Sequence, residues 1–212
     1  KSLSKKLKDQ KSIIAEIKKD KKKIAKSVNE KKKSEQKIRD LIVKLVEDAE
    51  AKRKKEEALR LSKTEKVAST ETKTKKEIDG SEYNFDLSTS KFTSFSDLKG
   101  KLNWPIPKGK VVRKFGESLN PKLKTLTVNY GIDIRAAGDM SVKCVAEGVV
   151  SAVEWLPGYG TVLIISHKGN YRTVYGHLSE VFIKEGDKIN TGGVIAKVGE
   201  SVEGNILHFE VW

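Results

Sequence analysis

Apolar residues recur with a seven-residue repeat along the first fifty positions, within a background rich in lysine and glutamate. Fourteen positions, from residue 3 to residue 49 in alternating steps of four and three, include ten apolar side chains. These are Leu3, Leu7, Ile14, Ile17, Ile24, Val28, Ile38, Ile42, Leu45 and Ala49. Such a narrow stripe on one helix face is typical of a coiled coil. The sequence therefore predicts a coiled-coil helical segment over residues 1–61.

A single helix of this kind needs a partner to bury its stripe, because helix propensity without packing gives only marginal stability. The partner is either another copy of the chain or an upstream helix. The start at Lys1, inside the helical pattern, favours an upstream helix and leads us to expect a preceding segment. Polar residues interrupt the stripe at Gln10, Lys21, Lys31 and Glu35. They either fix the register of the pair or mark a loosely packed stretch.

The composition changes after residue 79, since all glycines, prolines and aromatic residues lie beyond that point. Residues 62–100 are expected to form a linker, in which the aromatic-containing stretch 83–98 is a possible regulatory strap. From residue 101 onward, short runs rich in valine and isoleucine alternate with glycine and asparagine turns, as in antiparallel sheets. The predicted fold class is a multidomain α + β chain, in which a long helix precedes an all-β domain over residues 101–212.

The positive charge is concentrated in the first segment, where 27 basic residues face 15 acidic ones, a net charge of +12. Only three of these basic residues are arginine, and no aromatic residue is available for base stacking. A solvated helix surface is therefore favoured over nucleic-acid binding. The single cysteine, Cys144, lies in a predicted strand, so an intramolecular disulfide is excluded and a packed thiol is expected. No apolar run reaches membrane-spanning length.

Three motifs near the C-terminal end combine polar and aromatic residues on predicted strands. They are Asn129-Tyr130-Gly131-Ile132-Asp133, Tyr175-Gly176-His177 and Ile206-Leu207-His208-Phe209-Glu210. Side chains two or four apart on a strand share a face, so residues 129 and 133 are expected on one face, as are 206 and 208. Together with Trp104-Pro105, Tyr159-Gly160 and the surrounding blocks, the stretch from Leu102 to Trp212 resembles the LytM domain of lysostaphin-type zinc peptidases.

The resemblance also shows where this chain departs from a working peptidase. Asp133 and His208 match zinc ligands and His177 matches a catalytic histidine, whereas Asn129 and Ile206 stand where two further histidines are expected. Catalytic zinc usually has three protein ligands and one open position. We therefore expect no cofactor and no peptidase activity, with Asn129, Asp133 and His208 as relic metal positions. Asp133 and His208 either form a hydrogen-bonded pair or hold a metal weakly.

A coiled coil followed by such a domain resembles the EnvC-type murein hydrolase activators of Gram-negative bacteria. The resemblance implies a periplasmic, non-catalytic activator of a peptidoglycan amidase in cell division, connected through its coiled coil to an inner-membrane division complex. Peptidoglycan itself is a possible further partner, and no nucleic acid is expected. The former peptidase groove is expected to bind the partner through Tyr130, Asp133, Tyr175, His177, Ile206, His208 and Arg172.

Two alternative functions remain open. One is a zinc metalloendopeptidase that cleaves peptidoglycan cross-links, and the other is a non-catalytic peptidoglycan-binding module with a basic stalk. A further hypothesis concerns regulation: residues 83–98 or the end of the rod cover the groove in a resting form. The identity of the amidase, the partner of the coiled coil and the oligomeric state are not fixed by the sequence.

Overall fold

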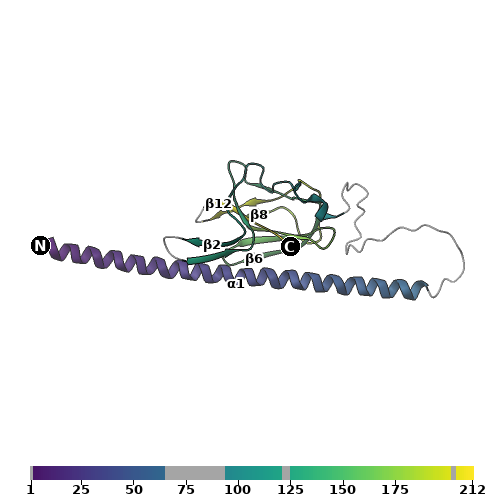
Figure 1. Cartoon of the computed structure of the whole chain (residues 1–212), viewed down its shortest axis with the longest axis horizontal. Coiled ribbons are helices and arrows are strands. Elements are labelled where there is room, and N and C mark those ends of the chain that lie inside the picture. Colours follow the sequence, from purple (N-terminus) through teal and green to yellow (C-terminus); the bar gives the residue numbers. More distant parts are fainter. Residues whose placement is uncertain (1, 65–93, 121–124, 202–203) are drawn as a thin grey trace.

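The computed structural model describes residues 2–64, 94–120, 125–201 and 204–212. One helix, α1 (Ser2–Thr64), runs past a β domain and extends beyond it on both sides (Figure 1). The helix contains no glycine or proline, so nothing in its sequence interrupts it. The predicted combination of a long helix and an antiparallel β domain is confirmed. The helix continues past the expected end at residue 61, and residues 65–93, with most of the proposed strap, lie outside the described residues.

Ten strands form one sheet in which all pairs are antiparallel, in the order β1-β4-β12-β8-β7-β6-β9, with β10 joining β8 to β5 and β11 beside β12. The bounds of these strands are β1 Lys110–Arg113, β4 Ile132–Arg135, β5 Ser141–Lys143, β6 Gly148–Leu156, β7 Gly160–Ser166, β8 Arg172–Val181, β9 Lys188–Ile189, β10 Val194–Val198, β11 Glu200–Ser201 and β12 Gly204–Val211.

A separate two-stranded ribbon, β2 (Gly116–Asn120) with β3 (Thr125–Asn129), was not predicted. Its apolar side chains Leu119, Leu126 and Val128 are exposed, so burial did not select its pattern. The ribbon leads directly into the first polar motif, because Asn129 is its last residue.

The main core lies on one face of the sheet. Its largest fully buried members include Tyr175, Leu163, Ile165, Ile195 and Leu207. A short 3-10 helix, η1 (Phe95–Leu98), closes one edge of this core with the ring of Phe95, so the folded domain begins before residue 101. Cys144 is buried and free, as the sequence predicted.

The opposite face of the sheet packs against α1. Ile38 and Ile42 of the helix are buried against an apolar shelf formed by Ala152, Leu156, Val162, Ile164 and Val174. These helix residues belong to the predicted seven-residue stripe, so the stripe packs on a sheet here and not on a second helix. In the first half of α1, the stripe residues Ile14, Ile17, Ile24 and Val28 are exposed. In the described residues, no helix is long and apolar enough to cross a bilayer.

Candidate functional site

Three neighbouring strands bring the polar motifs together. In the sheet register, Asp133 of β4 lies opposite His208 of β12, and His208 lies opposite Gly176 of β8. Glu210 shares the face of His208, because it lies two residues further along the same strand. The predicted juxtaposition of Asp133 with His208 is therefore present.

His208 lies between two carboxylates in a buried cluster. Its Nδ1 is 2.6 Å from Asp133 Oδ1, and its Nε2 is 2.7 Å from Glu210 Oε1. The guanidinium of Arg113 lies 2.8 Å from the second oxygen of Asp133, and the indole of Trp212 donates to the second oxygen of Glu210 at 2.6 Å. Every carboxylate oxygen of Asp133 and Glu210 thus has a partner.

The electrostatics of the cluster follow from these contacts. Burial alone would lower the pKa of His208, but the hydrogen bonds with Asp133 and Glu210 outweigh it, so the pKa is raised above its ordinary value. Burial would raise the pKa of Asp133, but the hydrogen bond and the charge of His208, together with Arg113, hold it below its ordinary value. The contacts therefore favour a charged imidazolium beside the ionised carboxylate of Asp133.

Tyr159 connects this cluster to the helix. It lies in the turn between β6 and β7 but is only 3% exposed because α1 covers it. Its ring stacks on His177, with centroids 5.3 Å apart, and meets His208 edge-on at 4.9 Å. Its hydroxyl donates to Glu35 Oε1 of the helix at 2.9 Å. Burial, followed by the nearby carboxylate of Glu35, raises the pKa of Tyr159.

His177 reaches the same place through an irregular backbone. Its φ is +62°, in the left-handed region that non-glycine residues seldom adopt. Its backbone N–H donates to the carbonyl of Tyr159 at 2.7 Å, which holds the turn and the strand together. Burial lowers the pKa of His177 to about 4, so the ring is neutral at physiological pH.

Polar residues of α1 lie directly over the site. Glu35 binds the Tyr159 hydroxyl, the ammonium of Lys31 lies 5.9 Å from the Tyr159 ring centre, and the guanidinium of Arg39 lies 4.0 Å from the ring centre of Tyr130. Ser34 donates its hydroxyl to the carbonyl of Pro157 in the same turn. Two of the polar interruptions predicted in the stripe, Lys31 and Glu35, therefore contact the site.

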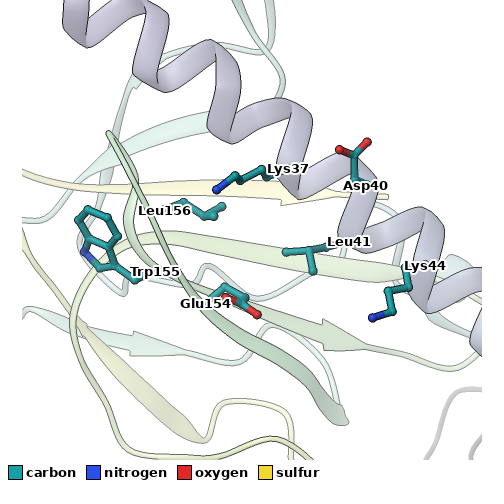
Figure 2. Close-up of a pocket in the computed structure, with 7 residues that line it drawn as sticks. All are labelled: Lys37, Asp40, Leu41, Lys44, Glu154, Trp155 and Leu156. Atoms are coloured by element: carbon teal, nitrogen blue, oxygen red, sulfur yellow. The ribbon is translucent and has the colours of Figure 1, made fainter.

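Side chains of α1 and β6 also line an open pocket of about 310 Å³ beside the apolar shelf. Figure 2 shows the helix side chains on one side of it and three successive residues of β6 on the other. The lining residues are Lys37, Asp40, Leu41, Lys44, Glu154, Trp155 and Leu156. Trp155 is 67% exposed, so the contact between helix and sheet is incomplete along this edge.

Three further predicted residues line the same region. Tyr130 is half-buried beneath Arg39. Ile206 is 3% exposed on the strand face that carries His208. Asn129 ends β3, where its side-chain amide donates to the carbonyl of Lys114 at 3.3 Å.

Tyr175 differs from the expectation that it lines the groove. Its side chain is fully buried in the main core, where the ring packs against Phe209 and the hydroxyl accepts from the backbone N–H of Val145. Alternation along a strand would place residues 175 and 177 on one face, but the left-handed backbone at His177 breaks the alternation. Arg172 is buried at the start of β8, where its backbone pairs with Trp212.

His167 is a packing residue outside the site. It is 4% exposed, stacks near Phe95, and contacts the carbonyl of Glu147 and the hydroxyl of Thr173 at 2.7 Å each. Burial lowers its pKa to about 4.

Sequence reasoning did not single out Arg113, Glu210 or Trp212 as parts of the site. Glu210 and Trp212 carried a usable signal, because they follow His208 at steps of two. Arg113 carried none, since it reaches Asp133 only through the pairing of β1 with β4.

Comparison with known proteins finds a family match in the C-terminal part of the chain. Residues 127–212 match the profile of Peptidase family M23. The chain is 31% identical over 103 residues to the murein hydrolase activator EnvC of Escherichia coli, which covers 49% of this chain and 23% of the relative. It is 34% identical over 121 residues to the murein hydrolase activator NlpD of Salmonella dublin, which covers 56% of this chain and 30% of the relative.

Among solved structures, Csd3 of Helicobacter pylori matches with 29% identity and a TM-score of 0.45, over 52% of this chain and 31% of that one. The chain spans less than a third of the length of the two curated relatives, EnvC and NlpD.

Proposed function

We propose that this chain, which carries a domain of peptidase family M23, is a non-catalytic activator of a cell-wall amidase. The role is related to peptidoglycan, as the names of the relatives EnvC and NlpD indicate. Related outer-membrane lipoproteins of Gram-negative bacteria are consistent with a place in the cell envelope. A periplasmic location and a connection of α1 to an inner-membrane division complex are parts of this proposal.

The observation that carries the proposal is the helix seated on the site. An amphipathic segment of α1 covers the face that carries His208, with Ile38 and Ile42 on the apolar shelf and Glu35 on Tyr159. A face that accepts such a segment has the chemistry of a helix-binding groove. We propose that the amidase docks on the same face through Tyr130, Tyr159, His177, Ile206 and His208.

Peptide-bond cleavage fits the side chains poorly. Ile206 has no group that can transfer a proton, and His177 has a ring nitrogen but is covered by Tyr159. Both nitrogens of His208 are engaged with carboxylates, so neither is directed at an open position. A zinc ion does not fit this arrangement, and the proposed function requires none.

The central part of α1 makes the described conformation a resting form in this proposal. The part of the rod that lies on the domain is residues 31–49, and not the end of the rod. The buried or half-buried side chains in this part include Lys31, Ser34, Glu35, Ile38, Arg39, Ile42 and Ala49. A pull on the exposed first half of α1 would remove this segment and expose the groove. The partner gains access only when the helix leaves.

The test is dye release from purified sacculi by the chain alone, by an amidase of the same bacterium alone, and by the mixture. The proposal predicts release above the amidase background only in the mixture. Release by the chain alone, abolished by a chelator, would instead identify a metalloendopeptidase. Salt-sensitive pelleting with sacculi, without any effect on the amidase, would identify a wall-binding module.

A further inference from the structure

A cation of the protein itself contacts Asp133, one of the positions that match a zinc ligand in the sequence resemblance. Arg113 of β1 is paired in register with Asp133 of β4, and its guanidinium Nε lies 2.8 Å from Asp133 Oδ2. The side chain of Asp133 is only 6% exposed, whereas that of Arg113 is 43% exposed. The guanidinium therefore reaches inward from the rim of the site to a buried carboxylate.

The rest of the cluster is complete without any added ion. Asp133 Oδ1 and Glu210 Oε1 are bound by the two nitrogens of His208, and Glu210 Oε2 is bound by the indole of Trp212. Every carboxylate oxygen of Asp133 and Glu210 therefore already has a partner within the protein, and neither ring nitrogen of His208 is left to bind a metal.

The side chain of Asn129 contacts the segment that follows β1. Its amide donates to the carbonyl of Lys114, the residue after Arg113. A histidine restored at position 129 would supply a third nitrogen or oxygen donor, the number that catalytic zinc usually needs. It would still meet an Asp133 whose second oxygen is held by a guanidinium.

We propose that Arg113 has taken over the electrostatic role of the metal in this domain and closes the site to zinc. The loss of the histidine at position 129 is then only one of two barriers to metal binding. Restoring that histidine is insufficient, and removing the guanidinium as well opens the site. The proposal concerns the metal alone and is independent of any amidase.

The test measures zinc bound per chain after dialysis in variants of this chain, by elemental analysis and by the absorption of added Co²⁺. Wild type and Asn129→His are expected to hold less than about 0.1 zinc per chain. The double variant Asn129→His with Arg113→Met is expected to approach one zinc per chain, at least a tenfold gain. The matched control replaces Arg113→Met by Lys110→Met, because Lys110 lies on the same strand and pairs with Arg135 instead. This control removes one positive charge but is expected to leave the site closed.

Three results would overturn the proposal: full zinc occupancy in wild type, the same occupancy in Asn129→His alone as in the double variant, or no zinc in a double variant that circular dichroism shows to be folded. If the double variant does not fold, the melting temperature of the single variant Arg113→Met provides a second test. Removing the cation beside Asp133 is expected to lower the melting temperature of Arg113→Met well below that of Lys110→Met. Equal melting temperatures would contradict the role assigned to Arg113.

Discussion

Ile38 holds the helix on the domain, so Ile38→Asp is expected to release it. The side chain of Ile38 is only 1% exposed and packs on the shelf that includes Leu156, Ile164 and Val174. Aspartate removes the apolar contact and places a charge against an apolar surface. The mutation acts on the docking of α1 and leaves the main core on the other face of the sheet unchanged.

The size of the effect follows from the burial. Full burial of an isoleucine side chain stabilises by about 1.5–3 kcal/mol, and an unpaired polar group in the same place costs a further ~1–3 kcal/mol. A loss of roughly 3 kcal/mol or more corresponds to a factor of at least about 100 in the docking equilibrium. The undocked helix would then fray, because a helix of this kind is marginal without packing.

Hydrogen exchange followed by mass spectrometry checks this on a peptide covering residues 30–49. Exchange there should be faster by about 100-fold in Ile38→Asp than in wild type. The control is Val43→Asp, because Val43 is on the same helix and is 55% exposed. The same charge placed there should leave exchange near the wild-type rate. Equal exchange in Ile38→Asp and wild type would refute the docked arrangement.

Two further predictions concern polar groups. Tyr159→Phe removes the 2.9 Å hydrogen bond to Glu35, whose pKa is already raised by burial, and should weaken docking by about 1–3 kcal/mol. Glu35→Gln keeps an acceptor for the hydroxyl of Tyr159, so hydrogen exchange in residues 30–49 should be slower in Glu35→Gln than in Tyr159→Phe. The opposite order would count against this hydrogen bond. His167, with its pKa lowered to about 4, contributes stability that is present above its ordinary value of 6.5 and is lost as the pH falls toward 4. Between pH 7 and pH 4, the free energy of unfolding measured with urea should fall by up to about 3 kcal/mol more in wild type than in His167→Gln, because other groups such as His177 contribute to both proteins. A pH dependence identical in the two proteins would argue against a buried neutral imidazole.

The seven-residue repeat predicted the helix and the side that it buries, but not what lies against that side. An apolar stripe is satisfied equally by a second helix or by an apolar sheet face, and Ile38 with Ile42 uses the sheet. For the polar positions Lys31 and Glu35, periodicity predicted either a role in the register or a loosely packed stretch. Their contact with Tyr159 depends on how the two parts of the chain dock, which periodicity does not encode.

The resemblance of the motifs predicted that Asp133 and His208 come together, and the period of two along β12 would also have found Glu210. The resemblance also led us to expect Tyr175 in the groove, but its side chain is buried in the main core, and the left-handed conformation of His177 reverses the alternation of the strand at that point. The role of Arg113 could not be predicted from the sequence, for a different reason. Its contact with Asp133 depends on the register between two strands separated by the β2–β3 ribbon.

We propose that a partner binds to the face beneath α1. Calorimetry tests this by comparing the affinity of a cognate amidase for wild type, Ile38→Asp and Val43→Asp. Ile38→Asp is expected to bind at least about tenfold more tightly than the other two, and adding His177→Ala to Ile38→Asp is expected to remove most of that gain. Equal affinities for all three proteins would contradict this proposal, because the helix would then not compete with the partner.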